Sequence, residues 1–371
     1  MVGATVLILW FPRRAAPPSS PPSPVVLASN SAPKVEAPVT PPAPPPAVAD
    51  EALQNACKAL RSKSDIAAIR ADLEALRQSL AAMPKREAIA AIRQFLDSKE
   101  DASTRLGFKL SSDGSLENAP TLRTFLLDEL SRIDPAAAAD YSRVILSSMD
   151  SADEWAVALR GLALGDDSAD GRTLLAEKAG QMLEYSPWQQ DPSVGYLESF
   201  DVAVYLGGTD LMGTLSDMVR SEDNSAISHA AFLALDRLVI SDPTDVLQAL
   251  EDDPDLMAGR ESTRADFFAR ANVTDPAQKS ILESYLLDPS IGAAELQTFA
   301  GIFPNANFML SANLLTQSTT PGGAAQANLD AQSLAVAQQW LADPRFAQVA
   351  PELQTIVQRL QGFVTQAQRG R

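Results

Sequence analysis

The pattern closest to a metal site lies between two stretches that we expect to be helical. Five residues match places 1, 3, 5, 6 and 12 of a calcium-binding loop: Asp166, Ser168, Asp170, Gly171 and Glu177. Hard oxygen ligands and a glycine at the sharp turn are what Ca²⁺ needs there. Serine is a weak third ligand, however, and Leu174 fills the ninth place, where a polar residue is usual. We therefore expect an acidic turn in which Ser168 or Asp170 caps the next helix, with calcium binding as the alternative.

Histidine chemistry would have to use His229, the single histidine of the chain. Neither the context nor the spacing of a Ser-His-Asp or Cys-His mechanism accompanies it. One histidine and one cysteine, Cys57, are too few for an ordinary zinc site. The sequence also lacks a phosphate-binding loop and the Gly-x-Ser-x-Gly turn of hydrolases. We predict no catalytic, cofactor-binding or metal-binding residue, and we expect His229 to be a partly buried packing or capping residue.

Trp188 lies between two prolines, in the stretch Tyr185-Ser-Pro-Trp-Gln-Gln-Asp-Pro192. We expect this stretch to be a loop that Trp188 pins to the core. The alternative is an exposed anchor for a partner protein, because tryptophan is enriched at the energetic centres of interfaces.

The strongest helical signal is the stretch Asp210–Val239. Apolar residues recur at helical spacing on both sides of a short acidic turn at residues 221–225. The first helix carries Leu211, Leu215, Met218 and Val219, and the second carries Ile227, Ala231, Leu235, Leu238 and Val239. Such a hairpin is too small to bury its inner faces alone, so it must stack on similar hairpins.

This hairpin resembles one repeat of the HEAT family of helical-repeat proteins. The second helix has the form Ala-Ala-x-x-Ala-Leu-x-x-Leu, carried by Ala230, Ala231, Ala234, Leu235 and Leu238. His229 stands where the family often has arginine. The resemblance covers residues 210–239 only, and a second copy at a fixed period is not visible. The resemblance implies a helical solenoid that binds other macromolecules, and it does not imply a catalytic activity.

Composition supports an all-α fold of helical hairpins, stacked as a HEAT-like or irregular α-solenoid. Hydrophobic residues reach 46% and aromatic residues only 6%, which suits helices that pack through small residues better than a β-sandwich. Asp-Pro pairs recur as helix starts, because aspartate caps free N–H groups and proline loses no hydrogen bond at the first helical position. The aspartates of these pairs are Asp134, Asp191, Asp242, Asp253, Asp275, Asp288 and Asp343.

The net charge of −17 is concentrated in the middle of the chain. Residues 97–300 hold 15 basic against 37 acidic residues, a net charge of −22, whereas residues 1–96 carry +4. Binding to nucleic acid needs lysine and arginine at the phosphates, so this body argues against a nucleic-acid partner. The charge names no partner, and the alternative interpretation is that the acidic residues keep an alanine-rich helical body soluble.

The N-terminal residues predict an anchor and a spacer. Residues 1–11 are apolar, and Arg13 and Arg14 follow. Eleven residues span only about half of a hydrocarbon core, so we expect a partial transmembrane or signal-anchor segment whose true start lies upstream. The disordered linker that we predict over residues 12–49 is rich in proline and cannot form a core.

The rest of the chain divides at proline- and glycine-rich breaks, of which residues 99–120 form the clearest. We predict the following segments: a helical hairpin region over 50–98, an acidic helical-repeat body over 119–303, a loop over 304–325 and a C-terminal helical pair over 326–368.

These patterns favour a non-enzymatic, membrane-tethered helical-repeat scaffold or adaptor that binds other proteins, with its body in the periplasm of a bacterial envelope. The partner protein and the oligomeric state are not encoded in any pattern that we find, and neither a cofactor nor a small-molecule substrate is indicated. The alternative is a helical envelope enzyme that acts on glycan with a carboxylate pair. Such an enzyme usually has aromatic platforms and two converging carboxylates, and the few tyrosines and tryptophans here are scattered. A cytosolic scaffold is a third interpretation.

Overall fold

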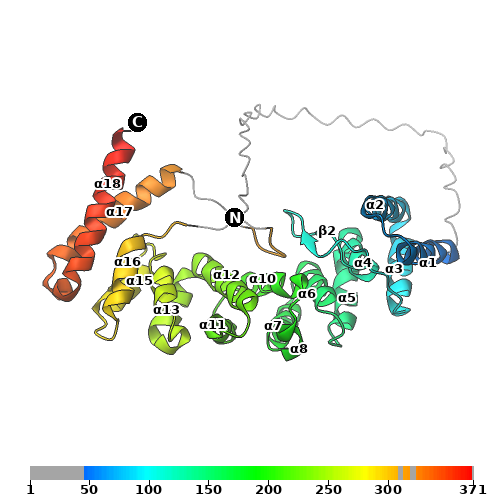
Figure 1. Cartoon of the computed structure of the whole chain (residues 1–371), viewed down its shortest axis with the longest axis horizontal. Coiled ribbons are helices and arrows are strands. Elements are labelled where there is room, and N and C mark those ends of the chain that lie inside the picture. Colours follow the sequence, from blue (N-terminus) through cyan, green and yellow to red (C-terminus); the bar gives the residue numbers. More distant parts are fainter. Residues whose placement is uncertain (1–45, 308–311, 318–322, 370–371) are drawn as a thin grey trace, which may run out of the picture. The chain divides into compact units, whose positions relative to one another are not determined.

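The computed structural model of the chain describes residues 46–307, 312–317 and 323–369 (Figure 1). They belong to one compact unit, Pro44–Arg371, while the other unit, Met1–Ala43, lies outside the described residues. Helices dominate the described part, and its β structure is one two-stranded sheet and one isolated bridge. The predicted all-α class is therefore confirmed. The predicted apolar segment 1–11 lies outside the described residues, as does the predicted linker except for its last residues, which belong to the first helix.

The elements of the N-terminal half are, in order, α1 (Pro46–Ser62), α2 (Ile66–Ala82), α3 (Lys85–Asp97), β1 (Lys109–Leu110), β2 (Leu116–Asn118), α4 (Leu122–Ile133), α5 (Pro135–Ile145), α6 (Ala152–Gly165), α7 (Ala169–Leu183), α8 (Ser186–Gln190) and α9 (Val194–Glu198).

The C-terminal half continues with α10 (Asp201–Leu206), α11 (Met212–Arg220), α12 (Ser225–Ser241), α13 (Pro243–Asp252), the 3₁₀-helix η1 (Pro254–Met257), α14 (Glu261–Phe268), α15 (Pro276–Leu287), α16 (Ala293–Ile302), α17 (Gly323–Ala342), the 3₁₀-helix η2 (Pro344–Val349) and α18 (Ala350–Arg369). Helices α17 and α18 coincide with the predicted C-terminal pair, and α17 begins inside the predicted loop 304–325.

Four of the Asp-Pro pairs start helices in the predicted way, with a side-chain oxygen that accepts a main-chain N–H of the first turn. Their aspartates are Asp134, Asp253, Asp275 and Asp343. Asp242 precedes α13 but makes no side-chain cap bond there. The prediction is wrong for Asp191 and Asp288. Ser193, rather than Asp191, caps α9, and Asp288 is engaged in a turn, where it accepts from the N–H and the hydroxyl of Ser290.

A short antiparallel hairpin of β1 and β2 occupies the predicted break at residues 99–120. Gly114 lies in its turn at a φ of +80°, a conformation that glycine adopts without strain. The hairpin buries Leu110 and Leu116. Runs of two and three residues are too short to show the alternation that identifies a strand. The helices on either side still meet, because α3 packs on α4 and Arg123 of α4 donates to a carbonyl of α3 at 2.6 Å.

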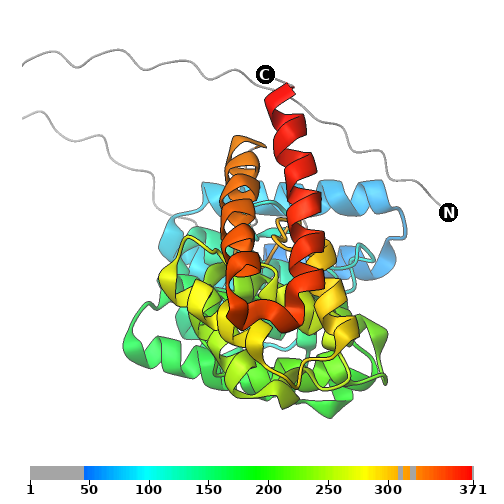
Figure 2. The same ribbon diagram turned by 90° about the vertical axis from the view of Figure 1, so that its left-hand side faces the viewer.

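The helices pack mainly on their neighbours in the chain (Figures 1 and 2). Direct partners include α5 with α6, α11 with α12 and α17 with α18, while α4 with α6, α10 with α12, α13 with α15 and α14 with α16 join one pair to the next. Helical hairpins are thus stacked along the body. The stretch Asp210–Val239 forms one of them, as α11 and α12 with a turn at residues 221–224, and its second helix buries Ala231, Leu235 and Leu238.

Close approach of α5 and α6 depends on a small residue at the end of α6. A side chain on Gly165 would overlap the carbonyl of Pro135, at the start of α5. By contrast, Gly213, in the first turn of α11, has open space where a side chain would begin. A side chain can therefore be added at Gly213 without overlap but not at Gly165, although both glycines lie in helices.

Within the described residues, no helix is both long and apolar enough to cross a membrane.

Candidate functional site

The calcium-like pattern is used for helix packing. Ser168 caps α7 by accepting from the N–H of Gly171 at 3.0 Å, as the capping interpretation of that turn predicts. Asp166 forms an ion pair with Arg143 of α5, and bonds from Ser168 together with that pair lower the pKa of the Asp166 carboxyl. In the part of the chain that the structure describes, no three His, Cys, Asp or Glu side chains are grouped so as to hold a metal ion.

His229 and Trp188 differ from their predicted settings. His229 is exposed rather than partly buried, although its ring packs by stacking on Phe232, with centroids 6.4 Å apart. Trp188 lies in α8 rather than in a loop. It is half-buried, and its ring meets Trp155 and two tyrosines edge to face. The prediction that Trp188 pins its segment to the core is confirmed.

Acid–arginine ion pairs join helices along the body, and sequence reasoning missed them. Asp128 of α4 binds Arg160 of α6, and Asp236 of α12 binds Arg270, which follows α14. Two further pairs are Asp201 with Arg237 and Glu295 with Arg264. Each acidic side chain is almost fully buried, and a buried charge is tolerated when it is paired. The signal that could have revealed these ion pairs is an acidic residue at a position where the helical spacing predicts an apolar one.

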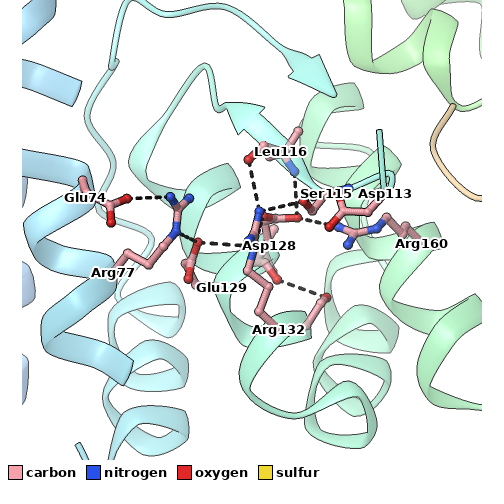
Figure 3. Close-up of polar contacts among 11 residues, drawn as sticks. Glu74, Arg77, Asp113, Ser115, Leu116, Asp128, Glu129, Arg132 and Arg160 are labelled. Carbon is pink, nitrogen blue, oxygen red and sulfur yellow. Dashed lines mark hydrogen bonds and ion pairs between the residues drawn. The ribbon is translucent and has the colours of Figure 1, made fainter. Parts of the chain in front are cut away.

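The Asp128–Arg160 pair fixes the β-hairpin to the helices (Figure 3). Asp128 accepts from Arg160, from Arg132 at 3.0 Å and from the N–H of Leu116 in β2 at 3.2 Å. Arg132 in turn donates to the hydroxyl of Ser115 at 2.7 Å, in the hairpin turn. The turn thus has a position set by α4 and α6.

Glu129, beside Asp128, connects this network to α2. Its carboxylate accepts from Arg77 of α2 at 2.7 Å (Figure 3). Burial raises the pKa of the Glu129 carboxyl, and the hydrogen bond and charge of Arg77 oppose that rise. The Arg77–Glu129 ion pair therefore links α2 to α4, and it offsets part of the free-energy cost of burying the Glu129 carboxylate.

Asp201, at the start of α10, differs from the other buried acids because it holds a segment from much later in the chain. The carboxylate is 1% exposed. One oxygen accepts from the main-chain N–H groups of Leu315 and Thr316, at 2.7 and 2.8 Å. The other accepts from the Thr316 hydroxyl and from Arg237 of α12, the latter at 2.9 Å. Both oxygens are thus occupied by donors, two of which belong to main chain.

Residues 312–317, here named the docked segment, are seated between α10 and the hairpin turn (Figure 1). Leu314 is 1% exposed, and its carbonyl lies against Gly114, where a side chain would overlap it. The amide of Gln317 donates to the carbonyl of Ser112 at 3.4 Å. More than a hundred residues separate the docked segment from α10 along the chain, yet one carboxylate and one turn position it.

A second anchor lies upstream of the docked segment. The N–H of Asn305 donates to the carbonyl of Ala269 at 2.7 Å, and its amide donates to Asp266. Arg270 donates to the carbonyl of Asn307 at 2.7 Å while it binds Asp236 through two bonds. Desolvation raises the pKa of the Asp266 and Asp236 carboxyls, and Arg270 opposes the rise in both.

Two adjacent residues of α12 serve the two anchors. Asp236 orients Arg270 at the upstream anchor, and Arg237 orients Asp201 at the docked segment. The arrangement binds polypeptide that is neither helix nor strand and is bent at residues 314 and 315. Carboxylates and carbonyls accept main-chain N–H groups, an arginine donates to a main-chain carbonyl, and a leucine is buried.

Comparison with known proteins gives no match to this chain among family models, curated proteins or solved structures. The resemblance of residues 210–239 to one HEAT repeat stays a prediction.

Proposed function

We propose that this chain is a non-enzymatic, membrane-tethered helical scaffold that binds other proteins in the bacterial envelope. The observation that supports the proposal is the docked segment: the body holds a bent stretch of polypeptide, outside any helix or strand, through Asp201. Such a surface acts by recognition without turnover, as the resemblance to helical-repeat proteins also implies.

The contacts explain how a stacked-helix body recognises polypeptide. A chain outside helices and sheets presents unpaired N–H and C=O groups, and burying them without partners is costly. Asp201 satisfies two successive N–H groups, and it is already held in place by Arg237. Because the acceptor is charged and already positioned by Arg237, the site itself loses little conformational entropy when a chain binds.

The tether rests on the sequence. Apolar residues 1–11, then Arg13 and Arg14, are the pattern of a membrane-anchoring end. A proline-rich stretch extends by about 3.1 Å per residue, so residues 12–45, which precede α1, are long enough to hold the body on the order of 100 Å from a membrane.

Cross-linking in native membranes tests both halves of the proposal. The full-length chain is cross-linked through its lysines, captured and analysed by mass spectrometry. We expect recovery from the membrane fraction and one reproducible partner linked to exposed lysines of the body such as Lys109, on β1. The matched control is Asp170→Asn, an exposed aspartate whose change should leave those links intact. Recovery from the soluble fraction alone would refute the tether. Absence of links between the body and any protein, across replicates, would refute the scaffold.

A further inference from the structure

We propose that the site at Asp201 is a recognition site for a bent segment of a partner protein, of the type Leu-Leu-Thr, and that the chain's own docked segment occupies it in the free protein. The inference rests on the proposed function and names the surface and the kind of partner. Displacement of the docked segment would then accompany partner binding.

The first support is that groups outside the docked segment position the site. Asp201 is oriented by Arg237, which belongs to α12. The turn of the β-hairpin on the other side is fixed through Ser115 and Leu116 to Arg132 and Asp128. None of these contacts involves residues 312–317, so we expect them to persist when the docked segment leaves.

The second support is that the docked segment is held by a short run of neighbouring residues. Leu315 and Thr316 contribute main-chain N–H groups, and the side-chain contributions include the Thr316 hydroxyl on Asp201, the Gln317 amide on the Ser112 carbonyl and the buried Leu314. A peptide that carries Leu-Leu-Thr-Gln and bends at the leucines, as residues 314 and 315 do, offers the same groups. The site therefore suits a short bent motif of another protein.

The third support is the way the occupant is attached. The upstream anchor holds Asn305 and Asn307 with its own partners, Asp266 and Arg270. Residues 312–317 are thus tethered independently of Asp201, and they can leave that site without releasing the chain at residue 307. A tethered ligand competes as if present at about millimolar concentration. If the docked segment has a micromolar Kd for the open site, a partner segment is then weakened on the order of 1,000-fold in the intact chain.

A labelled peptide of residues 311–318 provides the test, with binding followed by fluorescence anisotropy. We compare the full chain with Leu314→Asp, which cannot bury its own residue 314 but keeps Asp201. We expect Leu314→Asp to bind the peptide at least ten-fold more tightly than the unaltered chain. Adding Asp201→Asn should abolish the gain, adding Asp170→Asn should preserve it, and a scrambled peptide should not bind.

The result that overturns the inference is a folded Leu314→Asp chain, with native circular dichroism, that does not bind the peptide. If that variant does not fold, hydrogen exchange of the unaltered chain decides. Millimolar peptide should then speed exchange at residues 312–317 and leave residues 303–307 unchanged, and unaltered exchange throughout would refute displacement. If the peptide experiments fail but the body still cross-links to a partner, the proposed scaffold function is retained and its binding surface is not the Asp201 site.

Discussion

Loss of the Asp201 carboxylate should release the docked segment. The free energy of docking that segment follows from its contacts. Ordering six residues costs roughly 6–12 kcal/mol of backbone entropy. Three hydrogen bonds to a charged acceptor return roughly 5–9 kcal/mol, and burial of Leu314 returns about 1.5–3 kcal/mol. The net free energy of docking is therefore within a few kcal/mol of zero, so the loss of a single large contact should undock the segment.

Asp201→Asn makes that change with almost no change in size. The new NH₂ group faces donors, because Leu315, Thr316 and Arg237 all donate toward the carboxylate. We expect the docked segment to leave and the Leu315 and Thr316 amides to exchange as in an open loop. Arg237 also loses its charged partner, so the free energy of unfolding should fall by about 2–4 kcal/mol.

A double-mutant cycle with Leu314→Ala tests whether the segment acts as a unit. In the unaltered chain Leu314→Ala should cost about 2 kcal/mol, at the low end for a buried leucine, since undocking limits the loss. After Asp201→Asn, the same change should cost almost nothing, because the leucine is already exposed. The measurements are urea unfolding and hydrogen exchange of residues 312–317. Costs that add to within about 0.5 kcal/mol, or retained amide protection in Asp201→Asn, would refute the reasoning.

Three further predictions concern the helical body. Gly165→Ala should lower the free energy of unfolding by about 3 kcal/mol, since the new methyl overlaps the carbonyl of Pro135. Gly213→Ala, the control, should be neutral or stabilising by up to about 1 kcal/mol. Equal urea midpoints for the two variants would contradict this prediction. Burial raises the pKa of Tyr196 from 10.0 to about 12. The stability that the neutral Tyr196 side chain contributes is therefore complete below pH 10.0 and is lost as the pH rises through the folded-state pKa. A tyrosine titration at 295 nm that is complete by pH 11, below that folded-state pKa, would contradict the prediction. Trp188→Ala should cost about 2 kcal/mol and lower the melting temperature, because half-buried ring contacts with Trp155 are lost; an unchanged melting temperature would show that α8 is not pinned by this ring.

Local signals in the sequence determine most of the helices. Periodic apolar residues mark α2, α4 and α12, and the caps at Asp65, Asp134 and Ser168 follow from side chains that can accept a free N–H within their own first turn. These features depend on residues a few places apart, so the sequence alone suffices to find them. The same local logic fails at Asp288, whose carboxylate has a competing local donor in Ser290.

Tertiary structure alone decides which of the many acidic residues matter for binding. Asp201 and Asp170 are both aspartates near a helix start, yet one is buried under residues 315–316 and the other is exposed. The difference comes from a segment more than a hundred residues away and from Arg237 on another helix. No periodicity encodes such a contact, because its partners are set by how α10, α12 and the β-hairpin pack together. The sequence by itself determines an all-helical chain, and the packing of that chain turns one aspartate into a site that holds polypeptide.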